Sequence, residues 1–315
     1  MAKQKLETVF EAMYHGKFDF KHFISWPAAE LFKPIQIKDR VVYDADKNLK
    51  AYHKFLNLFV FEFLEINTDV VFSYRKGVNV IDAVKKHATS RHFFQTDLKN
   101  FFGSISSGMI RRCLEENIAN FPVSDIGEHL DRILDLVSVE NILPPGFSTS
   151  PLISNACLYH FDNKLELLCD SRGLIYTRYS DDILISGSEK KLYGLDVEIS
   201  AMLETSFGGR FQINRGKSRY NSVGGKVKML GVVILPNGEI TIDTKLKSKI
   251  EVLLHFFTSD RAKFNSMLEA EDVNGLLKVS GYLNYINTTD PLYLNKLRSK
   301  YGATVIDMFM RGSVK

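Results

Sequence analysis

One segment, residues 174–186 (LIYTRYSDDILIS), constrains the fold more than any other part of the chain. Its two ends are rich in β-branched, aromatic and aliphatic residues, and a polar junction, Ser180-Asp181-Asp182, separates them. Two strand-forming runs joined in this way predict a β-hairpin with both carboxylates at its tip. Adjacent like charges repel each other, and a divalent cation such as Mg²⁺ would resolve the conflict because it prefers hard oxygen ligands. An ordinary Asp-rich turn is the alternative.

A third aspartate, Asp97, follows a strand-like run and precedes the aromatic pair Phe101-Phe102. On its own this pattern is typical of a helix N-cap. Beside the Asp-Asp hairpin, however, Asp97 would supply a third carboxylate from a neighbouring strand. Two-metal phosphoryl transfer needs carboxylates that hold two cations about 4 Å apart, one at the attacking hydroxyl and one at the leaving pyrophosphate. The pair of motifs therefore predicts a site for two Mg²⁺ ions.

A loop rich in Pro, Gly and Ser, residues 143–155 (LPPGFSTSPLISN), leads into a predicted helix over residues 152–168. The first turn of a helix presents unpaired backbone N–H groups, which suit phosphates or sugar hydroxyls. A plain connector with a Ser or Thr cap is the alternative.

A basic stretch, residues 208–238, contains no acidic residue. Its cationic members are Arg210, Arg215, Lys217, Arg219, Lys226 and Lys228, with Phe211 and Tyr220 between them. Basic and aromatic residues together predict contacts with a nucleic-acid backbone. The alternative, a solvated charged face, is weaker because acids are absent throughout.

Composition sets wider limits. The 315 residues are 45% hydrophobic and 25% charged, and the formal net charge of +4 is too small to prove a nucleic-acid partner. The three cysteines are widely spaced, which favours a reducing compartment over a disulfide framework or a zinc site. No signal peptide is visible, and the most apolar run, residues 55–64, is shorter than the roughly 20 residues of a membrane span. We expect a cytoplasmic protein without a membrane partner.

The remaining pattern is mixed helix and strand. It predicts helices with aromatic anchors over residues 1–34, a strand or short hairpin over 35–43, a buried helix over 50–66, a strand over 70–77, two helices within 106–140 that are separated at Pro122, a helix over 190–207, a hairpin over 229–240 and a helical tail over 243–315.

The ordered set of motifs resembles that of bacterial reverse transcriptases, most closely the retron type. Tyr179-Ser180-Asp181-Asp182 is similar to the family's catalytic hairpin, and Asp97 with its aromatic pair is similar to the first catalytic motif. Three further motifs of the family have similar counterparts here, in the family's order, at residues 143–155, 214–217 and 230–231. The chain departs from the family at Pro145, where a Gln is usual, and it lacks the Asn-Ala-x-x-His and Val-Thr-Gly elements of retron enzymes.

The resemblance implies a role for each matching residue. Two Mg²⁺ ions would be bound by Asp97, the backbone of Leu98, Asp181 and Asp182. The incoming dNTP would be contacted by Arg40, Phe102, Gly146, Ser148, Ser150 and Lys217, with Phe102 excluding a 2′-hydroxyl. The template and primer would be contacted by Tyr179, Arg210, Arg215, Arg219, Lys226, Lys228, Leu230 and Gly231.

The implied fold is an α+β right-hand polymerase. Its expected parts are an N-terminal helical extension (1–34), fingers (35–96 with part of 103–150), a palm that carries the carboxylates (97–238) and a C-terminal helical thumb (239–315). The implied reaction is RNA-directed DNA synthesis from dNTPs on a dedicated structured non-coding RNA. A separate effector protein and a retron role in bacterial antiphage defence are implied as well.

Two other functions stay open at this point. One is a non-retron defence reverse transcriptase that makes repetitive or protein-primed DNA. The other is a non-catalytic RNA-binding scaffold, which the complete set of three aspartates disfavours because an idle site has no reason to keep adjacent buried carboxylates.

Overall fold

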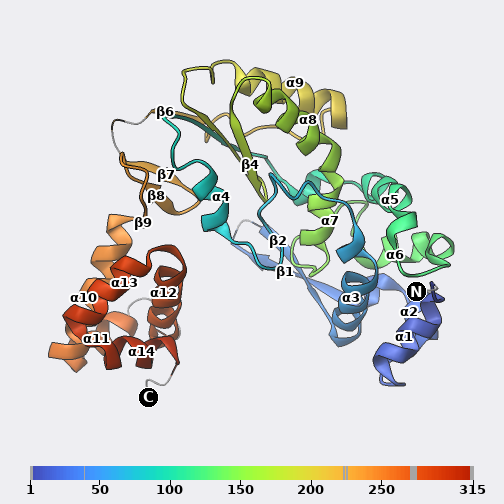
Figure 1. Ribbon diagram of the computed structural model, residues 1–315. Coiled ribbons are helices and arrows are strands. Elements are labelled where there is room, and N and C mark those ends of the chain that lie inside the picture. Colours follow the sequence, from blue (N-terminus) through green and yellow to red (C-terminus); the bar gives the residue numbers. More distant parts are fainter. Residues whose placement is uncertain (1–2, 39, 223, 225, 270–274, 313–315) are drawn as a thin grey trace. The chain divides into compact units, whose positions relative to one another are not determined.

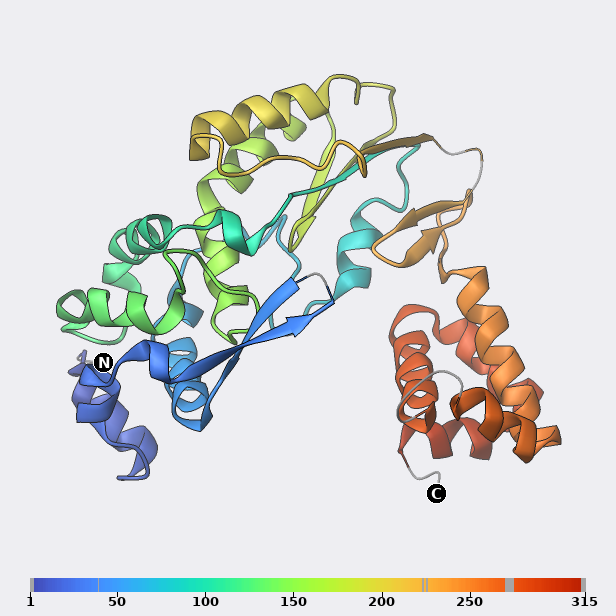
Figure 2. The same cartoon turned by 180° about the vertical axis from the view of Figure 1, so that it is seen from behind.

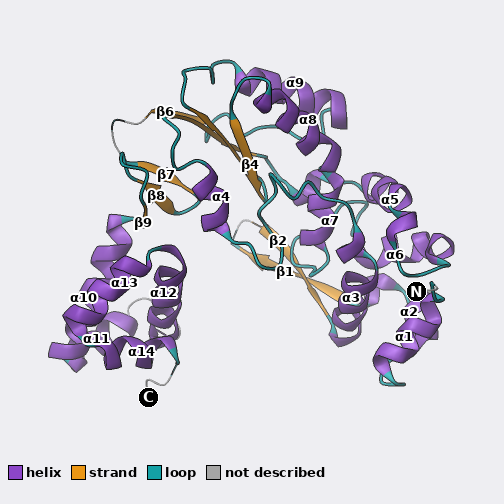
Figure 3. Cartoon of the chain, in the orientation of Figure 1, coloured by secondary structure: helices purple, strands orange, loops and turns teal. Residues whose placement is uncertain are grey.

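The computed structural model describes residues 3–38, 40–222, 224, 226–269 and 275–312 (Figure 1). The chain divides into two compact units, and each unit combines two segments of the sequence. Unit 1 contains Met1–Asn79 and Phe94–Tyr220, and unit 2 contains Val80–Phe93 and Asn221–Lys315. Figure 3 shows that helices predominate in both, with the strands gathered into small sheets.

Fourteen α-helices and nine strands are formed by the described residues, besides short 3-10 helices. The helices are α1 (Leu6–Tyr14), α2 (Phe20–Ser25), α3 (Lys47–Phe59), α4 (Val80–Lys86), α5 (Ser107–Glu116), α6 (Leu130–Val137), α7 (Ser150–Cys157), α8 (Tyr159–Asp170), α9 (Leu195–Phe207), α10 (Thr244–Ser259), α11 (Arg261–Glu269), α12 (Gly275–Thr289), α13 (Pro291–Tyr301) and α14 (Ala303–Met310). The strands are β1 (Phe32–Ile37), β2 (Arg40–Ala45), β3 (His92–Asp97), β4 (Ile175–Tyr179), β5 (Asp182–Gly187), β6 (Arg219–Ser222), β7 (Val227–Met229), β8 (Val232–Ile234) and β9 (Ile240–Ile242).

The strands form three sheets. The largest has the order β4-β5-β3-β6, while β1-β2 and β7-β8-β9 are separate antiparallel sheets. In the hairpin β4-β5, Ile175 pairs with Ser186 and Tyr179 pairs with Asp182. Every β5 residue after Asp182 is buried, which explains why its sequence is almost continuously apolar. Figure 2 shows helices α8 and α9 running side by side over this hairpin.

Local sequence signals set where several helices begin and end. The Asp46 carboxylate caps α3 by accepting from the Leu49 N–H at 2.7 Å, and the Ser106 hydroxyl caps α5 through the Met109 N–H. Pro151 lies in the first turn of α7, where its missing N–H costs nothing. Helix α9 ends at Gly208, whose φ of 58° is the left-handed conformation typical of a helix C-terminus.

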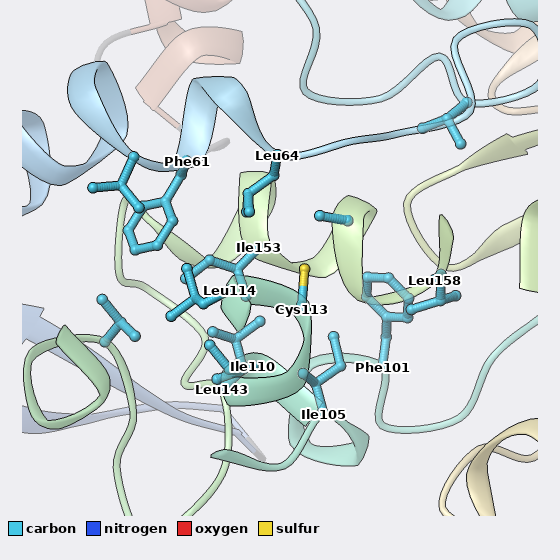
Figure 4. Packing of buried hydrophobic residues seen from close by; sticks show 14 of the residues in the cluster. Phe61, Leu64, Phe101, Ile105, Ile110, Cys113, Leu114, Leu143, Ile153 and Leu158 are labelled. Carbon is cyan, nitrogen blue, oxygen red and sulfur yellow. The ribbon is translucent and has the colours of Figure 1, made fainter. Parts of the chain in front are cut away.

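Each unit has its own hydrophobic core. In unit 1 the core joins helices, the four-stranded sheet and the loop before α7, and Figure 4 shows Phe61 and Leu64 packed toward residues of α5 and α7. Phe10 lies at the centre of an aromatic cluster with Tyr14, Phe23 and Phe55. In unit 2 the residues of α10, α12, α13 and α14 enclose a second core. Among the described residues, no helix has both the length and the apolar character needed to cross a bilayer.

Most predicted elements are present, with two differences. The strand expected over residues 70–77 is absent, and this segment instead makes one isolated bridge, Val71 to Arg178, beside β4. The helix expected over 152–168 is two helices, because the Leu158 N–H bonds to the Asn155 carbonyl and the chain turns there between α7 and α8. The predicted division into extension, fingers, palm and thumb stays a prediction.

His53 makes the stability of the fold depend on pH. Its ring is fully buried, with Nε2 2.7 Å from the Leu136 carbonyl oxygen. Burial lowers the pKa of His53 from 6.5 to about 4. At this position the unfolded chain binds a proton more readily than the folded chain. The contribution of neutral His53 to the free energy of unfolding is therefore complete above pH 6.5 and is lost as the pH falls toward 4.

We expect His53 alone to lower the free energy of unfolding by about 1.4 kcal/mol between pH 7.5 and pH 5.5. Urea titrations at the two pH values measure this difference. His53→Gln keeps an N–H donor and should remove that part of the pH dependence, whereas His255→Gln, at an exposed position, should not. An unchanged pH dependence in His53→Gln would contradict the assignment.

Candidate active site

Three carboxylates from two neighbouring strands line one cavity. Asp97 is the last residue of β3 and Asp182 is the first residue of β5. Asp181 lies in the turn before β5, where its carbonyl oxygen accepts from the Leu98 N–H at 3.0 Å. This backbone bond ties the end of β3 to the hairpin tip. The cavity has a volume of about 250 Å³ and is completed by Gln95, Thr96, Lys217 and Arg219.

The hairpin turn has an unusual backbone. Ser180, the first of its two loop residues, has a φ of 60°, a conformation typical of tight hairpin turns but strained for a residue with a side chain. This backbone places Asp181 and Asp182 next to each other at the tip, as predicted from the sequence.

The carboxylates repel one another. Burial raises the pKa of Asp182 to about 6, with further increases from Asp181 and Asp97, while Lys217 acts in the opposite direction. Lys217 Nζ lies 3.0 Å from Asp97 Oδ2, and this contact raises the pKa of Lys217. One lysine therefore offsets part of the charge of three aspartates.

The donor set fits a hard divalent cation. Asp97 is 7% exposed, and its Oδ1 atom is buried without a hydrogen-bond partner in the described part of the chain. Among the described residues, no three acidic, His or Cys side chains form a ready-made metal cage. Mg²⁺ does not require one, because it keeps several waters and usually binds through one or two carboxylates and substrate phosphates. A cation here would relieve both the repulsion and the unpaired oxygen.

A larger cavity of about 680 Å³ adjoins the carboxylates and shares Asp97, Asp181 and Lys217 with the first cavity. Its wall includes three predicted nucleotide-binding residues, Arg40 from β2, Phe102 and Lys217. The size lies within the usual range for small-molecule sites. The three predicted metal-binding aspartates and three of the six predicted nucleotide-binding residues thus line adjoining cavities, and Gly146, Ser148 and Ser150 do not.

The loop over residues 143–155 holds its shape through close backbone contacts. The Tyr43 N–H donates to the Pro145 carbonyl oxygen at 3.0 Å, so the loop pairs with β2. The Ser150 hydroxyl is buried and donates to the Pro144 carbonyl, and the Ser148 carbonyl accepts from Asn57. Ser148 and Ser150 are not among the residues that line the two cavities.

Gly146→Ala should destabilise the protein by about 2 kcal/mol or more. Gly146 has a φ of 102°, and a Cβ there would lie 2.5 Å from the Val42 side chain and 2.6 Å from the Tyr43 carbonyl oxygen. Urea titration measures the loss. Gly173→Ala is the matched control, since Gly173 also has a positive φ, 65°, but has no atom near its Cβ position. Equal losses at the two glycines would show that the clash is unimportant.

Comparison with known proteins identifies the family. The model of the family described as reverse transcriptase (RNA-dependent DNA polymerase) matches residues 37–234. The chain belongs to the reverse transcriptase family. The match confirms the predicted α+β right-hand polymerase fold and the predicted activity of an RNA-directed DNA polymerase.

Several relatives are retron enzymes of Escherichia coli. The retron Ec83 reverse transcriptase is 26% identical over 245 residues, covering 76% of this chain and 75% of that protein. The retron Ec73 enzyme is 28% identical and the match covers 83% of each chain, and the retron Ec86 enzyme is 23% identical over 84% of this chain and 78% of that protein. These matches support the retron type. A solved telomerase from Candida albicans in complex with telomeric RNA aligns with a TM-score of 0.43 and 12% identity, over 76% of this chain and 47% of that chain.

The basic residues of unit 1 do not all line one cavity. Lys217 and Arg219 line the carboxylate cavity, and Arg215 is exposed nearby in the sequence. Arg210 lines a different cavity of unit 1. The predicted nucleic-acid contacts of these residues stay predictions.

The rest of the basic stretch belongs to unit 2. Lys226 donates to the Thr244 hydroxyl at 3.1 Å, and Lys228 forms an ion pair with Asp243 at 2.6 Å. An acid just beyond the stretch therefore neutralises one of its lysines, which the sequence pattern did not indicate. The turn between β7 and β8 is formed by the predicted contact residues Leu230 and Gly231, with φ values of 47° and 85°.

A buried polar network that the sequence analysis missed supports the hairpin. Arg178 is 0% exposed in the middle of β4, and its Nε and Nη2 atoms donate to the two oxygens of Asp162 at 2.8 and 2.6 Å. Its Nη1 atom donates to Asn155 Oδ1 at 3.1 Å and to the Ser180 carbonyl at 3.0 Å. Tyr176 donates to Asp162 as well. The guanidinium therefore contacts the backbone of the strained turn directly.

Ser73 and Tyr74, near the end of the first segment of unit 1, complete the network. The Ser73 hydroxyl accepts from the Ser180 N–H at 2.8 Å, and the hydroxyls of Tyr74 and Ser180 lie 2.9 Å apart. Asn155 donates to the Ser73 carbonyl at 2.8 Å. A sequence signal did exist, because Asn155 and Asp162 are seven residues apart and polar within a largely apolar helical region.

Proposed function

We propose that this reverse transcriptase copies a dedicated structured non-coding RNA into DNA, with two Mg²⁺ ions bound by Asp97, Asp181, Asp182 and the backbone of Leu98. The convergence of three carboxylates on one cavity, with a buried unpaired oxygen on Asp97, carries the proposal. When bound, the ions lower the pKa of the attacking hydroxyl and neutralise charge on the leaving pyrophosphate.

The chain's own residues orient the substrate. In the proposal, the adjoining cavity takes the incoming dNTP. Lys217 and Arg40 face that cavity and attract the triphosphate. Phe102 is half-buried in the cavity wall, edge-on to Phe101 at 5.3 Å between ring centroids. Its rigid ring would pack under the sugar and leave no room for a 2′-hydroxyl.

The partners follow from the family. RNA template and dNTPs are the substrates of an RNA-directed DNA polymerase. The retron relatives support the further proposal that the RNA is a structured transcript that stays joined to its DNA copy. The helices α10–α14 would contact the A-form duplex as the thumb. A separate effector protein and an antiphage role complete the proposal, and these rest on the retron context alone.

The test is to purify the chain from its native locus and to sequence the nucleic acid that co-purifies. We expect one RNA joined to a DNA of defined sequence, and we expect the DNA to be absent from an Asp181→Asn/Asp182→Asn control. Repetitive or protein-linked DNA would contradict the retron type. RNA without DNA in both samples would contradict polymerase activity.

Phe102→Ala should reduce the preference for dNTPs over rNTPs at least about 10-fold, because a missing aromatic ring opens space for the 2′-hydroxyl. The measurement is the ratio of kcat/KM for the two nucleotide classes on a primed RNA template. Phe63→Ala is the control, since Phe63 is 40% exposed and does not line the cavity. A ratio that stays at the wild-type value would contradict the role of Phe102.

A further inference from the structure

A second large cavity of unit 1, with a volume of about 720 Å³, has no assigned role. It is lined by residues of α5, α7 and α8 and by the C-terminal end of α9 with the loop that follows. It shares no lining residue with the two cavities around the carboxylates. A ligand bound in it would leave the proposed active site accessible.

Three cations from different parts of the sequence face this cavity. They are Arg112 on α5, Lys164 on α8 and Arg210 after α9. All three are exposed, and none forms an ion pair within the described ranges of the chain. The neighbouring Arg111 differs, because it pairs with Asp131 and lies near Glu115.

Little negative charge balances these cations. Glu116 is the one carboxylate among the lining residues, and it lies 3.2 Å from the ring of His160, which also lines the cavity. Three positive charges against one carboxylate create a potential that attracts anions. Because all three side chains are exposed, they are able to reach a ligand.

Part of the cavity lining is apolar. Met109 and Phe207 are partly exposed there, whereas Phe161 is fully buried, with its ring centroid 6.0 Å from that of Phe207. Exposed cations beside one accessible aromatic ring match the two parts of a nucleotide, a phosphate and a base. An acidic protein segment would match the cations but would make less use of Phe207.

We propose that this cavity binds unpaired RNA, with Arg112, Lys164 and Arg210 on successive phosphates and a base against the ring of Phe207. The choice of RNA rests on the proposed function, because an enzyme dedicated to one structured RNA needs contacts outside the copied duplex. Several cations on separate elements suit a chain of phosphates better than one free nucleotide. This cavity would anchor the part of the RNA that is not being copied.

The experiment is a lysine footprint on the full chain. The protein is acetylated with a water-soluble ester, with and without a 30-nucleotide mixed-sequence single-stranded RNA, and the modification of each lysine is read by mass spectrometry. We expect the RNA to slow the acetylation of Lys164 at least fivefold. Lys50, which is exposed and paired with Asp44, should be unaffected. In Arg112→Gln the protection should weaken about fivefold at 0.1 M salt, because one phosphate contact is lost.

Arg111→Gln is the matched control, since it removes a neighbouring arginine of the same helix that already has acidic partners; it should keep the protection. No protection of Lys164 by saturating RNA would overturn the proposal and favour an acidic protein segment. Protection by AMP or dNTPs but not by RNA would overturn it in favour of a free nucleotide. Equal protection in wild type and Arg112→Gln would also overturn it. The footprint needs no polymerisation, so protection of Lys164 in a protein that incorporates no dNTP would contradict the proposed function and leave this inference standing.

Discussion

Asp182→Asn should reduce RNA-templated dNTP incorporation by at least about 10³-fold, because it removes a carboxylate from the proposed metal site. The fold should survive. Burial and the neighbouring carboxylates raise the pKa of Asp182 to about 6. At pH 7.5 Asp182 is therefore ionised at a cost to the stability of the folded chain, and a neutral amide removes that repulsion. The measurement is single-turnover incorporation on a primed RNA template, together with the melting temperature.

Metal binding gives this prediction a second measurement. Mg²⁺ should raise the melting temperature of the wild type, since a ligand that binds only the folded state stabilises it. That increase should be smaller in Asp182→Asn. Asp170→Asn, an exposed aspartate at the end of α8, is the control and should keep both activity and the response to Mg²⁺. Activity in Asp182→Asn within tenfold of wild type would refute the assignment of Asp182.

Arg178→Met should cost about 3–5 kcal/mol of stability, because it leaves the Asp162 carboxylate buried without its cation. The side chains of Arg178 and Asp162 are both 0% exposed, so water cannot replace the lost contact. Incorporation should fall as well, since the Ser180 carbonyl loses a donor and the strained turn loses support. Urea titration and single-turnover kinetics of the same variant measure the two effects.

Arg172→Met is the matched control for Arg178→Met. Arg172 also makes two hydrogen bonds to a carboxylate, Glu198, but the two side chains are 31% and 37% exposed. Its loss should cost about 1 kcal/mol or less. The double variant Arg178→Met/Asp162→Asn removes both charges and should be more stable than Arg178→Met alone. If Arg178→Met costs no more than Arg172→Met, the network does not support the turn.

The parts of the fold that were predictable are those specified by neighbouring residues. The hairpin around Asp181 and Asp182 follows from two apolar runs and a polar junction, and the caps of α3 and α5 follow from single side chains before apolar periodic runs. Asp97 ends a strand that neighbours the hairpin, as the strand-like run before it predicted, and its metal-binding role stays a prediction. Each of these sequence signals extends over fewer than fifteen residues. Strand pairing then brings the hairpin and the strand that ends at Asp97 together.

The parts that were missed depend on residues far apart in the sequence. Arg178 was missed because a buried arginine looks like any other strand residue until its partners Asp162 and Asn155 are seen beside it. The strand expected over residues 70–77 failed for a related reason, since its polar groups bond to Ser180 and Asn155 rather than to a continuous strand partner. Likewise, Lys228 looked unpaired because its partner Asp243 lies outside the basic stretch.

The strained turn at Ser180 has a consequence for movement during synthesis. The N–H, carbonyl and hydroxyl of Ser180 each form a hydrogen bond with a different side chain of unit 1. We therefore expect the turn to keep its position within unit 1 while DNA is synthesised. A stationary aspartate pair, which is catalytic in our proposal, cannot follow the growing 3′ end. After each addition, the duplex must therefore slide by one base pair past the aspartate pair. We expect pausing to depend on how tightly the protein binds the nucleic acid and on secondary structure in the template.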